Sequence, residues 1–206
     1  MPIIRLLAIA LVVAACGRKA GTPPAPAPQP LAAYAVQKLI LTPTGYVRAD
    51  TTAFMRRSGG ITTRALDSAL VTTLTARGLA QNWILPAALV ATYERNRTYA
   101  PDPYRLALLP LRSAEFVAAS RFAEPLSSQL RTMIALHEDA RFVLVPVELR
   151  FEPMGTAARA VLKIALVDPR FAHANWVGTV EGDAAATPAL ALPSVAARVA
   201  DLFLAP

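Results

Sequence analysis

The two histidines are the residues of this chain best suited to general acid–base chemistry, because imidazole titrates near neutral pH. Each has a carboxylate close by in sequence: Asp139 follows His137, and Asp168 precedes His173. Either pair could supply a base and the group that orients it. His137 falls on the apolar side of a predicted helix near its end, which favours a packed or capping imidazole. His173 is expected in a solvated turn. No serine lies in a G-x-S-x-G turn, so the sequence gives a hydrolase little support.

Metal and nucleotide sites are not indicated either. The chain has no cysteine and histidine spacing of the kind that binds zinc. Glu181 and Asp183 flank Gly182, but the further oxygens that a calcium loop needs are missing. The glycines form no phosphate-binding pattern. We therefore expect no cofactor and no metal, and a protein that is not an enzyme.

The only cysteine, Cys16, ends an apolar segment at the start of the chain. Arg5 supplies a positive charge, and Leu6–Ala15 are apolar and end in small residues, which is the pattern of a secretory signal peptide. The segment is too short to cross a hydrocarbon core of about 30 Å as a helix. Val13-Ala14-Ala15-Cys16 resembles the lipobox of bacterial lipoproteins. The resemblance implies that residues 1–15 are removed and that Cys16 is lipidated.

The same resemblance implies the location. Gly17 follows the cysteine, where the inner-membrane retention signal of bacterial lipoproteins typically has aspartate. We therefore expect the outer membrane, with the folded domain in the periplasm. Several acyl chains such as palmitate on Cys16 would hold the protein firmly, since each buried methylene contributes about 0.8 kcal/mol. With the only cysteine acylated, the fold has no disulfide and must rely on its core.

Residues 16–33 are interpreted as a tether, and residues 34–206 as a single domain. Proline alternates with alanine after Thr22, which favours extended polyproline II of roughly 50 Å in total. A ligand for a proline-binding module is the alternative interpretation of this segment. The remainder of the chain has the length of one ordinary domain.

The chain is basic, with a formal net charge of +7, and 54% of its residues are hydrophobic. The cations are mostly arginines scattered along the sequence, whereas a nucleic-acid site would need them clustered on one element. We therefore expect no nucleic-acid partner. Arg56, Arg57, Arg95 and Arg97 are by default solvated charges. If the domain binds peptidoglycan or an acidic protein, these arginines are the first candidates for the contact.

Trp83 and Trp176 could stack on a sugar or peptide ligand. Both lie in predicted apolar strands, so packing in the core is the favoured interpretation.

Hydrophobic spacing predicts the elements of the first half of the domain. Val36–Val47 is strand-like and ends near Pro43, followed by a polar loop over Arg48–Gly60. A helix from Thr62 or Thr63 to Arg77 carries its leucines at i, i+4 and i+8, and Gly78 should end it. Asn82–Leu85 is predicted as a short strand, and Pro86 begins a helix through Tyr93.

The segment Asn96–Ala123 is less regular. A helix that begins at Asp102-Pro103 is favoured there. A buried strand over Arg105–Leu111, interrupted by Pro110, is the alternative.

The second half is predicted as follows. Pro125 begins a helix whose apolar stripe runs from Leu126 to His137. Phe142–Phe151 is a strand with Val143, Val145, Val147, Leu149 and Phe151 on one face, and Pro146 implies an edge or a bulge. Further strands cover Arg159–Val167 and Ala174–Val180, and Ser194 is expected to cap a terminal helix.

This order predicts an α+β (α/β) protein of two layers, with helices on a central mixed sheet, a C-terminal antiparallel meander of three strands, and a terminal helix. The ending Leu166-Val167-Asp168 followed by Asn175-Trp176-Val177-Gly178-Thr179-Val180 resembles the periplasmic αβ module of the TolB N-terminal domain, CsgG and LpoB-type lipoproteins. That resemblance covers roughly Val36–Leu204 and implies an accessory or assembly role in the cell envelope. The Asn96–Ala123 segment and Pro146 depart from the pattern.

Three hypotheses follow. The first is a non-enzymatic lipoprotein whose domain binds a protein partner or peptidoglycan. The second is a carrier of a small ligand or lipid, with a deep apolar pocket between sheet and helices. The third is an envelope hydrolase that uses His137 or His173. The sequence does not indicate the oligomeric state.

Overall fold

The structure is a computed structural model that describes residues 29–48, 63–137 and 140–204. Its elements, in chain order, are η1 (Ala32–Tyr34), β1 (Leu39–Leu41), α2 (Thr63–Ala76), η2 (Leu79–Asn82), α3 (Pro86–Arg95), α4 (Leu109–Arg112), α5 (Leu126–Ala135), β2 (Phe142–Met154), β3 (Ala157–Asp168), β4 (His173–Ala185) and α6 (Pro188–Asp201). Within these ranges, no helix is both long and apolar enough to cross a membrane.

The strands form one mixed sheet in the order β1-β2-β3-β4. Strand β1 runs parallel to β2, and the other neighbours are antiparallel. The helical connection from β1 to β2 is long, as a parallel pair requires, whereas β2, β3 and β4 follow each other through short turns. The predicted α+β class, mixed sheet, antiparallel meander and terminal helix are confirmed.

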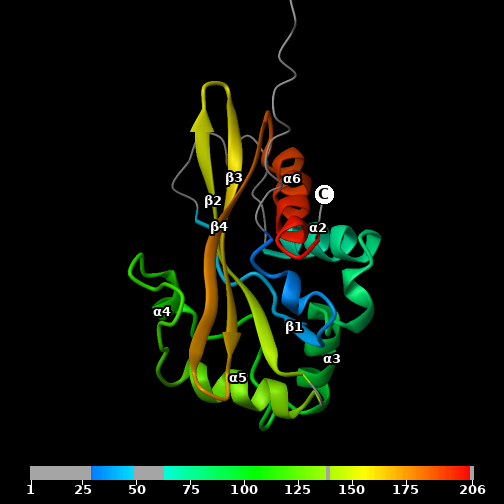
Figure 1. Cartoon of the computed structure of the whole chain (residues 1–206), viewed down its shortest axis with the longest axis vertical. Coiled ribbons are helices and arrows are strands. Elements are labelled where there is room, and N and C mark those ends of the chain that lie inside the picture. The colour runs from blue at the N-terminus through cyan, green and yellow to red at the C-terminus, as the bar shows by residue number, and fades with distance from the viewer. Residues whose placement is uncertain (1–28, 49–62, 138–139, 205–206) are drawn as a thin grey trace, which may run out of the picture.

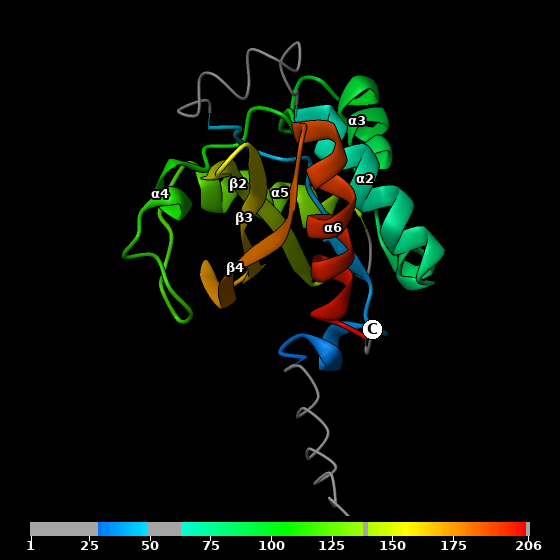
Figure 2. The same cartoon turned by 90° about the horizontal axis from the view of Figure 1, so that it is seen from above.

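One face of the sheet packs against α2 and α6. Leu66, Leu70 and Leu74 of α2 are fully buried there, which confirms the predicted stripe, and α6 adds its own apolar face. Gly78 adopts φ +75° just after α2, a left-handed conformation that favours glycine and ends the helix. Figures 1 and 2 show α2 and α6 side by side on this face.

The opposite face of the sheet is also covered, but only over part of its area. Leu126, Leu130 and Met133 of α5 pack there with Leu89 of α3 and Leu111 of α4. Figures 1 and 2 show α4 across the strands from α6. The second apolar cluster therefore adds a partial layer to the two predicted ones.

Strand β2 changes the face of its side chains at a bulge. Pro146 lies opposite Ile164 and Glu148 opposite Lys163, so Val147 is the extra residue. As a result, Val143, Val145 and Val147 pack on the α5 face, whereas Leu149 and Phe151 pack on the α2–α6 face. The bulge predicted from Pro146 is confirmed. The prediction that all five of these apolar side chains share one face is wrong, because one extra residue reverses the alternation.

The strand predicted over Val36–Val47 is a strand only at Leu39–Leu41. Beyond Thr42 the chain still follows β2, with the Gly45 N–H bound to the Pro146 carbonyl at 2.9 Å and an isolated bridge at Val47. Regular pairing stops because Pro43 has no N–H to donate. The strand predicted over Asn82–Leu85 is reduced to a single bridge between Ile84 and Ile40, preceded by η2.

The favoured helix from Asp102 is wrong, and so is the alternative strand over Arg105–Leu111. Only Leu109–Arg112 forms a helix, α4, and the rest of the segment is irregular. Asp102 accepts a hydrogen bond from the Tyr104 N–H at 2.9 Å, which makes a local turn rather than a helix cap. The helices predicted at Pro86 and near Pro125 are present.

The terminal helix begins at Pro188 rather than at Ser194. Thr187 is its cap and accepts from the Leu190 N–H, with proline at the first helical position. Ser194 lies inside α6, where its hydroxyl donates to the Ala191 carbonyl and accepts from the Asp183 N–H. Pro193 lies inside α6, whereas proline usually marks the start or a break of a helix. The helical turns before Pro193 were therefore not predicted.

The folded domain begins before residue 34. Leu31 is fully buried, and its N–H donates to the Leu202 carbonyl at 3.0 Å. Residues 31–33, which the sequence assigned to the tether, therefore belong to the domain. One apolar residue after a proline-rich stretch has no periodicity that could reveal its burial.

Candidate partner-binding groove

The polar residues of the sheet gather where α5 and α4 leave its face uncovered. Glu148, Lys163 and Thr179 lie opposite one another on β2, β3 and β4, so they form a row across one face. The bulge at Val147 is what turns Glu148 to this face. The end of α4 and the following segment, with Phe116 and Val117, face this row. The space between them is an open groove of about 430 Å³, which we call the Lys163 groove.

Arg112, the last residue of α4, is held from two sides in the Lys163 groove. Its Nε donates to Glu148 Oε2 at 2.7 Å, and its guanidinium lies 3.7 Å from the centre of the Tyr46 ring. Arg48 is a second cation near the same carboxylate, at 3.8 Å from Glu148 Oε1. Since Arg112 has five N–H donors, this arrangement leaves its terminal nitrogens for a planar acceptor.

Lys163 points its ammonium toward the same corner. Its Nζ donates to the carbonyl of Ser113, the residue after Arg112, at 2.5 Å. Burial lowers the pKa of Lys163, although the Glu148 carboxylate opposes that shift. Within the described ranges Lys163 forms no ion pair. The ammonium has three N–H donors, and one carbonyl partner leaves donors that can bind an anionic ligand.

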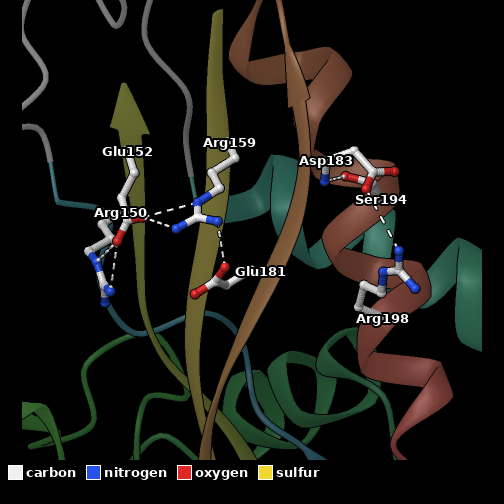
Figure 3. A network of polar contacts seen from close by, with 7 residues as sticks. All are labelled: Arg150, Glu152, Arg159, Glu181, Asp183, Ser194 and Arg198. Atoms are coloured by element: carbon white, nitrogen blue, oxygen red, sulfur yellow. Dashed lines mark hydrogen bonds and ion pairs between the residues drawn. The ribbon is translucent and has the colours of Figure 1, made fainter. Parts of the chain in front are cut away.

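Arg150 lines the groove and is also the first member of a ladder of ion pairs on β2, β3 and β4. Figure 3 shows this ladder from Arg150 through Glu152 and Arg159 to Glu181. Glu152 accepts from Arg150 at 3.0 Å and from Arg159 at 2.7 Å, and Arg159 also reaches Glu181 at 2.6 Å. The Arg159 and Arg150 hydrogen bonds lower the pKa of Glu152. Glu152 therefore compensates Arg150 of the groove, and the printed ion pairs of Glu152 and Glu181 are with Arg150 and Arg159 rather than with Arg112 or Lys163.

Of the four predicted contact arginines, the two that the structure describes, Arg95 and Arg97, do not line the groove. Arg56 and Arg57, like Cys16, lie outside the described residues. Arg95 and Arg97 are exposed at the end of α3 and just beyond it. Arg97 is paired with Glu94, whose carboxylate raises its pKa, and Arg95 donates to the Thr92 hydroxyl at 3.4 Å. Figure 1 shows α3 away from α4, so these arginines and the Lys163 groove do not form one surface.

Of the two predicted histidine pairs, only His173 with Asp168 lies wholly in the part of the chain that the structure describes. His137 is partly buried, and burial, then Lys38 and Arg95, lower its pKa. Its predicted partner Asp139 lies outside the described residues. His173 is paired in register with Asp168, but that carboxylate is bound by Arg170 at 2.7 Å and Arg141 at 3.3 Å.

The Asp168 carboxylate is therefore structural. Its side chain is 2% exposed. Burial raises its pKa, but the hydrogen bonds from Arg170 and Arg141 outweigh burial, so the pKa lies below its usual value.

Both tryptophans take part in the core, as predicted. Trp83 is buried and meets Phe203 edge-on at 4.9 Å between ring centres. Trp176 packs against the α2–α6 cluster. Its ring lies over Gly178, where an added Cβ atom would overlap the indole. Gly178 thus makes room for Trp176, and both rings are used in packing within the fold.

Sequence patterns missed a buried carboxylate. Asp67 of α2 is 6% exposed and accepts from both the N–H and the hydroxyl of Thr44, each at 2.7 Å. Tyr104 donates to it at 3.1 Å. Desolvation raises the pKa of Asp67 despite these hydrogen bonds. The available signal was an acidic residue directly beside Leu66 in the apolar stripe.

The geometry of the described residues adds no support for a metal site or for the hypothesis of a lipid carrier. No group of three or more metal-ligating side chains occurs among residues 29–48, 63–137 and 140–204. Glu181 and Asp183 are instead engaged by Arg159 and Arg198. The hollow between α3 and α5, beside Leu89 and Met133, measures about 10 Å³, which is the space of a single water and no room for a lipid chain.

Comparisons with solved structures give a distant likeness. No protein-family model matches the chain, and no curated protein matches it. Two solved structures of the PelC dodecamer from Paraburkholderia phytofirmans, one of them a single-substitution variant, are similar to it at 14% to 16% identity. Each alignment covers 82% of this chain and 89% to 90% of the PelC chain, with a TM-score of 0.39.

Proposed function

We propose that this chain is a non-enzymatic lipoprotein of the bacterial outer membrane, held by acyl chains on Cys16, whose αβ domain binds a protein partner or peptidoglycan in the periplasm. The observation that carries the proposal is the segment Leu6–Cys16: an apolar signal region that ends in small residues and in the only cysteine of the chain. The accessory role shared with TolB-type and CsgG-type modules is part of the same proposal.

The arrangement of the domain supports this function. Leu31, the first buried residue in the part of the chain that the structure describes, follows directly on the Pro/Ala segment and docks beside the end of α6. The proposed tether would then join Cys16 to a domain with a partly uncovered sheet face. That face carries charged side chains and a groove, which are features of a binding surface rather than of a core.

The anchoring is tested by labelling and fractionation. Cells that express the full chain should incorporate radiolabelled palmitate into it, and the protein should sediment with membranes. Cys16→Ala should abolish both, because the thiol is the acceptor of the lipid. A Cys16→Ala protein that takes up label or still sediments with membranes would contradict the proposal.

A further inference from the structure

Two cations of the Lys163 groove, Arg112 and Lys163, face the single carboxylate of Glu148 among its lining residues. Arg48 and Arg150 also line the groove, and both have further partners. Glu152 outside the groove compensates Arg150. The remaining excess is concentrated where Lys163 binds the Ser113 carbonyl, next to Arg112.

The two cations at that corner are already ordered. Arg112 is fixed between Glu148 and the Tyr46 ring, and Lys163 is fixed by Ser113. A ligand carboxylate that meets both would not have to order two long side chains, which removes a cost of binding. Planar guanidinium donors suit a carboxylate, because two parallel N–H bonds can reach its two oxygens.

The remaining walls fit a peptide better than a sugar. Ala114, Val117 and Val177 give the groove an aliphatic lining. Of its aromatic neighbours, Tyr46 is 40% exposed but already has Arg112 over one face of its ring, and Phe116 is 7% exposed. The groove is also lined by Val177, Gly178 and Thr179 of β4, which is the last strand of the sheet. An extended peptide could lie beside that edge.

We propose that the Lys163 groove binds an acidic peptide segment of a partner protein, with Arg112 and Lys163 as direct contacts of a side-chain carboxylate. The inference rests on the proposed function in that it names the partner surface of the domain. It does not depend on Cys16.

The probe is a fluorescently labelled oligo-glutamate peptide, titrated with the detergent-solubilised full chain and followed by anisotropy. An oligo-glutamine peptide of the same length is the control ligand. We expect the glutamate peptide to bind at least about tenfold more tightly, and its dissociation constant to rise with salt, since the contact is between charges. Equal binding of the two peptides would overturn the proposal.

The matched variants are Lys163→Gln and Arg95→Gln, each of which removes one positive charge. The Lys163→Gln side chain is one atom shorter than lysine but keeps an uncharged donor on β3, and equal melting temperatures of variant and parent will show that the fold is kept. We expect Lys163→Gln to weaken peptide binding about tenfold, the value of one hydrogen bond to a charged group. Arg95→Gln, on α3, should leave it within about twofold. Equal losses in both variants would overturn the assignment, because only the net charge would then matter.

Purified peptidoglycan distinguishes the other ligand class. Sacculi that displace the glutamate peptide, in a manner that Lys163→Gln abolishes, would reassign the groove to peptidoglycan and overturn the protein-segment proposal. Sacculi that leave the bound peptide in place would support it. The Cys16→Ala protein should bind the peptide as the parent chain does, so failure of the anchor and failure of the groove give different results.

Discussion

Thr44 gives both its backbone N–H and its hydroxyl to one oxygen of the buried Asp67, each at 2.7 Å. This pair ties the first turns of α2 to the segment that leaves β1, at the point where regular pairing with β2 stops. Tyr104 reaches the other carboxylate oxygen at 3.1 Å and so joins the irregular segment before α4 to the same centre. One carboxylate thereby holds three chain segments that are distant in sequence.

The first prediction concerns the loss of this carboxylate. Asp67→Ala should lower the free energy of unfolding by about 2 kcal/mol, because the buried donors of Thr44 lose their acceptor. Asp67→Asn keeps an oxygen for Thr44 and should remain within about 1 kcal/mol of the parent. Urea unfolding near pH 7 measures both. Equal destabilisation by the two substitutions would show that the acceptor oxygen is not what matters.

The pH dependence of Asp67 follows from its raised pKa. The Asp67 carboxyl binds its proton more tightly in the folded state than in the unfolded state. The contribution of Asp67 to stability is therefore largest below the unfolded pKa and falls as the pH rises through the folded pKa. The amide of the Asp67→Asn variant cannot titrate. The stability of the parent relative to Asp67→Asn should therefore increase as the pH is lowered from about 7 to about 4. A constant difference over this range would contradict the desolvation that the structure indicates.

Asp168 should behave in the opposite way. Its pKa is lowered in the fold, so its stabilisation is present above the unfolded pKa and is lost as the pH falls through the folded pKa. Because Arg170 and Arg141 are themselves about half exposed, we expect Asp168→Ala to cost only about 1–2 kcal/mol near pH 7. The cost should shrink in acid. A cost that persists unchanged in acid would mean that packing, not charge, explains it.

The contact between Gly178 and Trp176 gives a prediction about packing. Gly178→Ala would make a Cβ atom overlap the indole and should destabilise the fold by about 1–3 kcal/mol, with a shift in tryptophan fluorescence. The same change in a Trp176→Ala background should cost clearly less, since the atoms that clash are gone. An equal cost in both backgrounds would assign the effect to the backbone.

The boundary of the domain can be tested at Leu31. Leu31→Ala should lower the free energy of unfolding by about 2–4 kcal/mol, because it empties a fully buried position. Val36→Ala, at a side chain that is 82% exposed, is the control and should change little. If Leu31→Ala leaves the free energy of unfolding unchanged, residues 31–33 belong to the tether and not to the domain.

The predictions from sequence succeeded where side chains repeat with the period of one element. The leucines of α2 and the alternation of β3 gave their elements and buried faces correctly, and Gly78 ended its helix where expected. The predictions from sequence failed where a single residue interrupts the repeat of apolar side chains. Val147 shifts Leu149 and Phe151 to the other face, and Pro193 concealed the first turns of α6. Neither effect can be derived from the local sequence. The bulge depends on the pairing of β2 with β3, and the start of α6 depends on the helical turns before Pro193.

The candidate site was harder to anticipate than the fold. The arginines named from sequence were chosen as adjacent or nearly adjacent charges, whereas Arg112 and Lys163 are far apart in the chain. They line one groove because α4, in the segment with the least regular pattern, packs against β2, and the residue after α4 binds Lys163 of β3. The sequence by itself determined the apolar periods that make the helices and strands, and it supplies the whole argument for an anchor at Cys16. The tertiary structure decided which charges converge, because distances between elements depend on register, on the bulge in β2 and on packing.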